Sequence, residues 1–166
     1  MHNVAKESDL YEPMCNWLRG MMKDKYKRQN CEIRVVESGE LELEKVLEDN
    51  GILSYFPKIV GLKIQIDVLG MAIWSDHAEL IFIEAKKTKL VLKDLGQLWA
   101  YCKLCDPVEA FLLTSADLGS LDKVLNHLAR EDMLDYGDQR LVKKMKVGRW
   151  DILRQTVDEN SLIPKI

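Results

Sequence analysis

Apolar residues recur at helical spacing in two long segments, which predicts helices over residues 8–22 and 92–105. The first stripe consists of Leu10, Met14, Trp17, Leu18 and Met21. The second consists of Leu95, Leu98, Trp99 and Cys102. Asp106-Pro107 ends the second helix, because the residue before a proline avoids the helical conformation. A third helix is predicted over 118–130, and a short acidic one over 41–48.

Runs of apolar residues bounded by turn-forming residues predict strands over 31–36, 62–74, 78–86 and 108–114. A short edge strand is predicted over 150–153. The run 78–83 is apolar on both faces, which is typical of a central strand covered by helices. No repeat or linker interrupts the sequence. The pattern therefore predicts one α/β domain spanning 1–166, with a mixed β-sheet flanked by α-helices.

Three polar side chains, Asp67, Glu84 and Lys86, lie on the predicted hairpin. Residues i and i+2 of a strand share a face, so Glu84 and Lys86 point the same way. A two-residue loop at Ser75-Asp76 places Asp67 opposite Glu84, whereas one at Asp76-His77 places it opposite Lys86. Either register gathers the three side chains on one face, with opposed Cβ atoms about 5 Å apart. Two acids and a lysine at one point suit a divalent metal ion and a water nucleophile.

Composition and charge set limits on partners and location. The 166 residues are 47% apolar and 31% charged, which is ordinary for a soluble globular protein. No apolar stretch is long enough for a transmembrane helix, and the first residues lack a signal-peptide core. We therefore expect a cytoplasmic protein without a membrane partner. The formal net charge of −3 means that a nucleic-acid partner would need a local basic surface.

Two cysteines, Cys102 and Cys105, have the CxxC spacing of a metal or redox site. They lie on a predicted helix, far along the sequence from Cys15 and Cys31. We interpret them as small buried apolar residues of a reducing compartment. The sequence contains no glycine-rich phosphate loop and no nucleophile elbow, which argues against ATP hydrolysis and against a serine hydrolase.

Four short motifs follow one another along the chain. Residues 7–11 (ESDLY) begin the first helix with an acid, Asp67 lies on the first hairpin strand, and Glu84-Ala85-Lys86 end the second. Residues 97–101 (QLWAY) carry a QxxxY pattern on the second long helix. In this order the motifs resemble the PD-(D/E)xK nuclease superfamily, RecB-type members included, whose fold is called restriction-endonuclease-like. Ile66 stands where the proline of the family motif would be, but that proline carries no ligand atom.

The resemblance implies an enzyme: a nuclease, dependent on Mg²⁺ or on Mn²⁺ in its place, that hydrolyses phosphodiester bonds in DNA during restriction, repair or recombination. It implies that the side chains of Asp67 and Glu84 and the carbonyl of Ala85 hold the ion through hard oxygen ligands. Glu7 would contribute through water or to a second ion. The alternative for Glu7 is an acid favoured at the helix start by the helix dipole.

The resemblance also implies that Lys86 stabilises the attacking water or the charge of the scissile phosphate, and that Gln97 orients Lys86 or the phosphate. The alternative is an internal salt bridge between Lys86 and the two acids, which would leave excess negative charge. The alternative function is a catalytically silent nuclease-fold module for DNA binding or assembly. A homodimer is compatible with either function.

The DNA-binding surface is predicted at Lys87, Lys89 and Lys93, because these lysines directly follow the acid-bearing strand. A second basic cluster lies further along the chain and consists of Arg140, Lys143, Lys144, Lys146 and Arg149, with Arg154 just beyond. This second cluster either joins the DNA-binding surface or forms a solvated basic face.

Overall fold

A mixed six-stranded β-sheet forms the centre of the molecule in a computed structural model that describes residues 4–138 and 140–165. The strands lie in the order β1-β2-β3-β4-β7-β8. Their bounds are β1 Glu32–Glu37, β2 Val68–Ile73, β3 Ala78–Lys86, β4 Glu109–Thr114, β7 Lys146–Asp151 and β8 Thr156–Ile163. β4 pairs in parallel with β3 and with β7, and the other neighbours are antiparallel. The predicted α/β class with a mixed sheet is confirmed.

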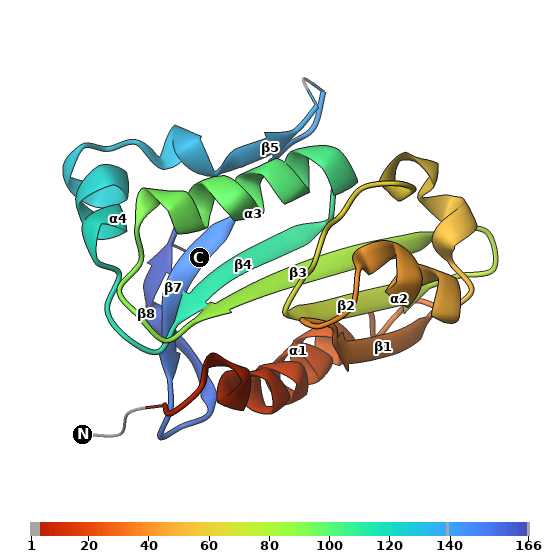
Figure 1. Cartoon of the computed structure of the whole chain (residues 1–166), viewed down its shortest axis with the longest axis horizontal. Helices are drawn as coiled ribbons and strands as arrows, with labels where there is room; N and C mark the ends of the chain where they lie inside the picture. Colours follow the sequence, from red (N-terminus) through yellow and green to blue (C-terminus); the bar gives the residue numbers. More distant parts are fainter. Residues whose placement is uncertain (1–3, 139, 166) are drawn as a thin grey trace.

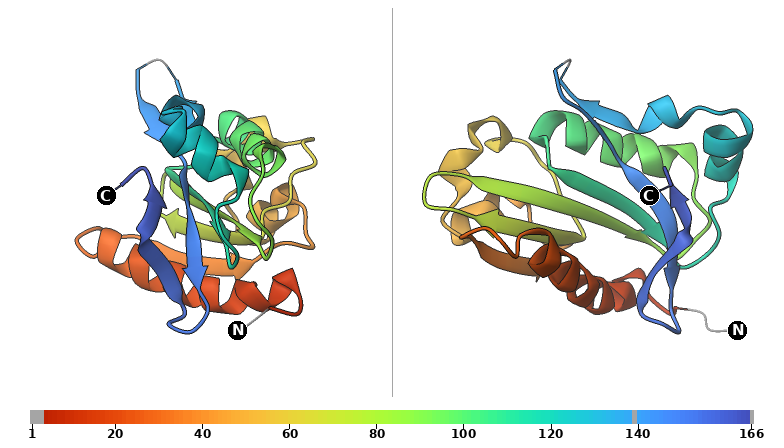
Figure 2. Two further views of the ribbon diagram at one scale, coloured as in Figure 1. Left: turned by 90° about the vertical axis from the view of Figure 1, so that its left-hand side faces the viewer. Right: turned by 180° about the vertical axis from the view of Figure 1, so that it is seen from behind.

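Helices cover both faces of this sheet (Figure 1). On one face lies α1 (Tyr11–Lys25), preceded by the 3-10 turn η1 (Glu7–Leu10). On the other lie α3 (Leu92–Cys105) and the short α2 (Leu43–Asp49), and the views in Figure 2 show the same two layers. No helix in the described part of the chain is long and apolar enough to cross a membrane.

β3 is buried on both faces, as predicted for a central strand. Leu80 and Phe82 belong to the core beneath α3, whereas Ile81 and Ile83 belong to the core beneath α1. This arrangement buries the strand along most of its length and leaves its carboxyl end, at Lys86, slightly exposed. The polar residues at that end therefore occupy the boundary between core and solvent.

The β2–β3 hairpin adopts the first of the two predicted registers. Val68 pairs with Ile83, and the register continues through Ile73 and Ala78. The Trp74 N–H donates to the His77 carbonyl at 2.9 Å, which closes a two-residue turn at Ser75-Asp76. Continued by one residue beyond the strand, the same register places Asp67 opposite Glu84.

The prediction that a strand begins near residue 62 is wrong, because β2 begins only at Val68. Residues 63–67 alternate between exposed and buried as a strand does, but their backbone carbonyls accept from the segment between the end of β1 and the first residue of α2. The Ile64 carbonyl accepts from Leu43 N–H at 2.7 Å, and the Asp67 carbonyl accepts from Ser38 N–H at 3.0 Å. A loop thus replaces the partner strand at this end of the hairpin.

The last third of the chain differs most from the expectation. In place of a helix over 118–130, α4 (Ser120–Asp122) leads into a π-helical turn, η4 (Lys123–His127). Ala129 then ends it with a φ of 54° in the left-handed region. The segment predicted as an edge strand begins inside β7, an inner strand, and the edge strand is β8.

A separate two-stranded ribbon lies beside α3 (Figure 1). It pairs β5 (Asp135–Gly137) with β6 (Val142–Lys144) and follows the 3-10 turn η5 (Glu131–Leu134). Two further 3-10 turns, η2 (Leu53–Tyr55) and η3 (Pro57–Ile59), lie between α2 and β2. The short ribbon strands lack the alternating apolar pattern that identifies a half-buried strand in sequence.

Gly70 and Gly20 test how closely α1 approaches the sheet. A Cβ at Gly70 would lie 2.6 Å from Met22 Sδ and 3.0 Å from Leu18 Cδ2, whereas a Cβ at Gly20 would meet nothing within 4 Å. We expect Gly70→Ala to lower the free energy of unfolding by about 1–3 kcal/mol through overpacking. Gly20→Ala should instead raise it by about 0.5–1 kcal/mol through helix propensity. Urea unfolding measures both, and stabilisation by both variants would contradict the close packing of α1.

Candidate active site

The carboxylates of Asp67 and Glu84 meet at the end of the β2–β3 hairpin. Glu84 shares its face of β3 with Leu80 and Phe82, which lie in the core beneath α3. Asp67 has the same facing, because it precedes Leu69 of that core by two residues. The Asp67 N–H donates to Glu84 Oε1 at 3.4 Å. The predicted meeting of the two acids on one face is confirmed.

A polar cavity of about 400 Å³ opens over this acidic pair. Its lining includes Lys86 from β3, Gln97 and Tyr101 from α3, and Lys63 and Gln65 from the extended segment before β2. The polar side chains of residues 63–67, which alternate with buried isoleucines, therefore line a cavity. The two acids, the lysine and the glutamine that the sequence singled out are brought together in one place.

Two hydrogen bonds hold the Asp67 carboxylate. The Tyr11 hydroxyl donates to Oδ1 at 3.0 Å, and the Ala85 N–H donates to Oδ2 at 2.8 Å. Burial raises the pKa of the Tyr11 phenol far above its ordinary value, and the charge of Asp67 adds to that effect. The phenol therefore stays protonated and keeps its donor. Since the N–H and C=O of one strand residue point to the same side, the Ala85 carbonyl also faces Asp67.

Glu84 is a buried acid with a like-charged neighbour. It is only 6% exposed. Burial raises the pKa of Glu84 well above its ordinary value near 4.5, and the Asp67 carboxylate raises it further, whereas Lys86 opposes the shift. The ionised pair is therefore a strained electrostatic arrangement that a nearby cation would relieve.

Lys86 is held by an acid that the sequence did not single out. Its Nζ lies 4.0 Å from Asp94 Oδ1, and both side chains are mostly buried. Asp94 also accepts the Val91 N–H at 3.0 Å and so caps the start of α3. Gln97, expected to orient Lys86 or the phosphate, donates to the Tyr101 hydroxyl at 3.1 Å.

Glu7 lies in η1, half-buried, in the turn that brings the chain against β3. Its charge contributes to the raised pKa of the Tyr11 phenol, which places it within electrostatic reach of that residue. No hydrogen bond joins its side chain to Asp67 or Glu84 within the described residues. Because no three such acids are grouped to hold a metal ion within the described residues, any contribution of Glu7 to an ion at the pair would pass through water.

The lysines predicted to contact DNA are all exposed. Lys87 Nζ donates to the Ala5 carbonyl at 3.1 Å, and Lys89 lies 3.7 Å from Asp117 Oδ2. The second basic cluster is largely paired with acids. Its ion pairs join Lys143 to Asp106, Lys144 to Asp135 and Lys146 to Glu109. Internal pairing of this kind reduces the charge that the second cluster can offer to a phosphate backbone.

The oxygen atoms at the acidic pair fit a hard divalent cation. The carboxylates of Asp67 and Glu84 line one cavity, Glu42 lines it as well, and strand geometry turns the Ala85 carbonyl toward Asp67. Among residues 4–138 and 140–165, no three or more His, Cys, Asp or Glu side chains are grouped so that they could hold a metal ion. An ion at this point would therefore take two side-chain ligands, with a backbone carbonyl and water for the rest, as Mg²⁺ commonly does.

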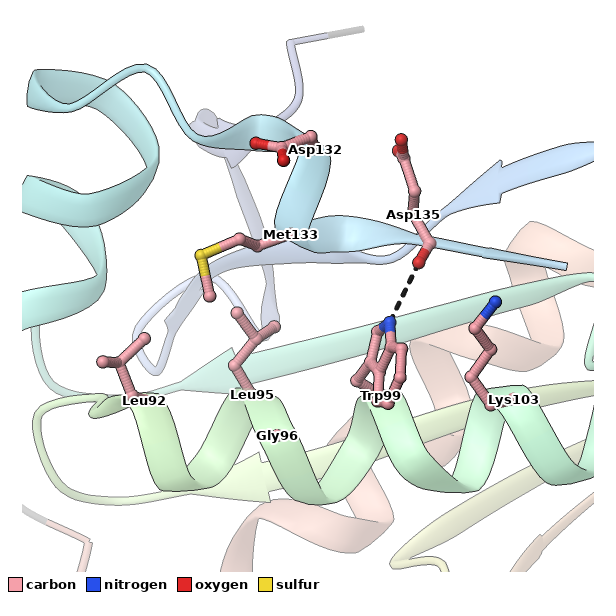
Figure 3. Close-up of a pocket in the computed structure, with 8 residues that line it drawn as sticks. All are labelled: Leu92, Leu95, Gly96, Trp99, Lys103, Asp132, Met133 and Asp135. Atoms are coloured by element: carbon pink, nitrogen blue, oxygen red, sulfur yellow. Dashed lines mark hydrogen bonds between the residues drawn. The ribbon is translucent and has the colours of Figure 1, made fainter.

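A second cavity, of about 500 Å³, lies along the other flank of α3, beneath η5 and β5 (Figure 3). Leu92, Leu95 and Met133 give it an apolar lining, and Trp99 Nε1 donates to the Asp135 carbonyl at 3.0 Å. Trp99, predicted in the core stripe of its helix, is 39% exposed and lines this cavity instead. The acidic pair belongs to the smaller, more polar cavity.

Cys102 and Cys105 are buried on the core side of α3, and both are free thiols. Burial raises the pKa of the Cys105 thiol to about 12. Thiols in this state pack as small apolar residues and are poor nucleophiles, because reaction requires the thiolate.

Comparisons with known proteins found no match for this chain among protein-family models, curated proteins or solved structures. The arrangement of the side chains therefore carries the functional argument. Sequence reasoning assigned no role to Tyr11 or Asp94, the residues that contact Asp67 and Lys86. Tyr11 follows Glu7 by one helical turn, and this spacing could have indicated that both side chains face the site. Asp94 stands in the first turn of α3, where an acid is favoured by the helix dipole whatever its other contacts.

The raised pKa of Glu84 predicts a characteristic pH dependence of stability in metal-free protein. Between about pH 4.5 and the pKa of the folded state, the folded chain keeps a proton that the unfolded chain has released. Stability therefore falls as the pH rises through this window. Glu84→Gln, which mimics the protonated acid, should lack this loss and exceed the wild type in stability at pH 8.

Urea unfolding in EDTA from pH 5 to 8 measures this difference. Glu159→Gln, a substitution of an exposed acid on β8, is the matched control and should follow the wild-type curve. Parallel curves for Glu84→Gln and the wild type would rule out a raised Glu84 pKa.

Proposed function

We propose that this chain is a Mg²⁺-dependent nuclease of the PD-(D/E)xK type, with a restriction-endonuclease-like fold, that hydrolyses phosphodiester bonds in DNA. One observation carries the proposal. Glu84 is buried beside Asp67 at the end of a hairpin, and the lysine two residues further on pairs with Asp94 instead. Neighbouring carboxylates removed from water are costly without a cation. A site that keeps such a pair is best explained by an ion that binds there.

The carboxylates of Asp67 and Glu84 would hold the ion, together with the Ala85 carbonyl. Mg²⁺, or Mn²⁺ in its place, supplies Lewis-acid activation of water and phosphate at such a site. The chain contributes the position of the ligands: β3 fixes Glu84 and Ala85, and the hairpin register fixes Asp67 opposite them. Glu7 would assist through water, from the half-buried turn before α1.

Lys86 would stabilise negative charge that develops on the attacked phosphate. It lines the same cavity as the two acids, and Asp94 holds its amine at the rim of that cavity. A lysine suits this role because its ammonium is a compact charge on a flexible stem. Gln97, which lines the cavity and donates to Tyr101, would bind a phosphate oxygen through its amide.

DNA would run past the cavity over Lys87, Lys89 and Lys93. The three exposed lysines follow β3 or begin α3, beside the acidic pair. Because the whole chain carries a formal charge of −3, attraction to the phosphate backbone has to come from a local surface of this kind. The second basic cluster, paired internally with acids, is the weaker candidate.

Substitution of the acidic pair tests the catalytic proposal. We expect Asp67→Asn and Glu84→Gln each to abolish metal-dependent cleavage while the protein stays folded. Lys86→Ala should lower the rate by about 10²-fold or more, as expected for loss of a group that stabilises developing charge. The measurement is cleavage of linear, supercoiled, flapped and branched DNA with Mg²⁺, with folding followed by circular dichroism.

Glu159→Gln and Lys58→Ala are the matched controls, because each removes an exposed charge of the same type outside the cavity. Wild-type cleavage by Asp67→Asn would refute the site, and near-normal cleavage by Lys86→Ala would make the lysine structural. A wild-type protein that binds DNA but cleaves none of these substrates would favour the silent binding module.

Neutralising the lysine surface tests the DNA path separately. In an Asp67→Asn background, changing Lys87, Lys89 and Lys93 to Gln should weaken binding similarly across DNA sequences. It should also flatten the slope of log K against log salt by about 2–3, since each lost phosphate contact is worth about 0.9. Fluorescence anisotropy at several salt concentrations measures the slope.

The control changes the exposed residues Lys23, Lys27 and Lys58 to Gln, which removes the same charge elsewhere on the surface. If both triple variants lose the same slope, binding depends on overall charge, and the proposed DNA path is wrong.

A further inference from the structure

The Asp67 carboxylate accepts hydrogen bonds from two elements that are far apart in the sequence. The Tyr11 hydroxyl, on the first residue of α1, donates to Oδ1 at 3.0 Å. The Ala85 N–H, near the end of β3, donates to Oδ2 at 2.8 Å. One bond to each oxygen fixes the rotation of the carboxylate as well as its place, which a single bond would leave free.

We propose that Tyr11 is a positioning residue that presents the Asp67 carboxylate to a divalent cation. This inference deepens the proposed function and rests on it. Tyr11 does not touch the ion or the substrate. It acts through Asp67, by holding the carboxylate in the orientation that ion binding needs.

These two hydrogen bonds leave the carboxylate able to bind an ion. A carboxylate oxygen has two lone pairs, so one hydrogen bond to each oxygen leaves acceptor sites on both. A carboxylate that is already oriented loses less conformational freedom when it binds an ion. Removal of a residue that hydrogen-bonds to a metal ligand commonly lowers metal affinity or activity by about 10- to 100-fold.

The third side of the Asp67 side chain is closed by the loop after β1. The Ser38 N–H donates to the Asp67 carbonyl at 3.0 Å. A Cβ at Gly39 would lie 3.2 Å from Tyr11 Cε2 and 3.4 Å from Asp67 Oδ1. A methyl group at Gly39 would therefore crowd the tyrosine ring by a few tenths of an ångström, next to the carboxylate. The added methyl group of Gly39→Ala would contact both Tyr11 and Asp67.

The N-terminal end of α1 is thereby tied to the end of the hairpin. α1 packs against β1 and β2 through its apolar face, and Tyr11 adds a polar contact at the end nearest the site. A purely structural reading would make this bond one more tie between helix and sheet. The two readings differ in whether loss of the hydroxyl changes metal affinity or only the stability of metal-free protein.

The test is Tyr11→Phe, which removes only the hydroxyl. Mn²⁺ binding is measured by calorimetry and by the rise in melting temperature with metal concentration, for the wild type and the variant. We expect the variant to bind Mn²⁺ about 10- to 100-fold more weakly. The Mn²⁺ concentration that gives half-maximal DNA cleavage should rise by a similar factor.

Tyr55→Phe is the matched control. The Tyr55 hydroxyl donates to the Ser75 carbonyl at 3.0 Å, at the turn of the hairpin and at the opposite end from Asp67. This variant also loses one tyrosine hydrogen bond, but its Mn²⁺ affinity should equal that of the wild type. Gly39→Ala provides a second variant at the site and should weaken Mn²⁺ binding in the same direction as Tyr11→Phe.

Equal Mn²⁺ affinity in the wild type, Tyr11→Phe and Gly39→Ala would overturn the positioning role and leave the proposed nuclease function standing. Equal weakening in Tyr11→Phe and Tyr55→Phe would also overturn it, because the effect would then be general. A wild type that binds no divalent ion would overturn the proposed function and this inference together. Selective weakening at Tyr11 and Gly39 is the result that supports the inference.

Discussion

The register of the β2–β3 hairpin is the constraint on which the site depends. Side chains alternate between the faces of a strand, so a slip of one residue would send Asp67 or Glu84 to the other side of the sheet. The turn at Ser75-Asp76 sets the register, and Trp74 and His77 flank that turn with their rings stacked 4.4 Å apart. Everything proposed for the acidic pair follows from this pairing.

The acidic pair lies at the boundary between the buried core and the solvent. Glu84 lies on β3, next to residues of the core beneath α3, whereas Asp67 lies just before the first residue of β2. At Asp67 the backbone is paired with the loop that follows β1, and no longer with a strand. The opening left by the missing pairing becomes the polar cavity. Such a site costs stability, since Glu84 is held beside a like charge with a raised pKa. Local rules of folding are commonly broken in this way at functional sites.

The two long helices contribute to the site in similar ways. α1 begins with Tyr11, which donates to Asp67, and the first turn of α3 contains Asp94, which lies against Lys86. Each helix packs on its own face of the sheet through apolar residues, and each brings one polar side chain from its start to the strand ends. The helices on the two faces of the sheet therefore both contact the site. Neither helix alone would position all three of Asp67, Glu84 and Lys86.

The sequence by itself determined the central part of the fold and the members of the acidic site. Helical spacing predicted α1 and α3, apolar runs predicted β1, β3 and β4, and strand alternation placed Glu84 and Lys86 on one face. These features are local, so their periodicity is visible in the chain. The choice between two hairpin registers, the later start of β2 and the polar strands β5, β6 and β8 were decided by tertiary structure. The contacts of Tyr11 with Asp67 and of Asp94 with Lys86 were decided in the same way, because packing of separate elements, rather than any local pattern, brings those residues together.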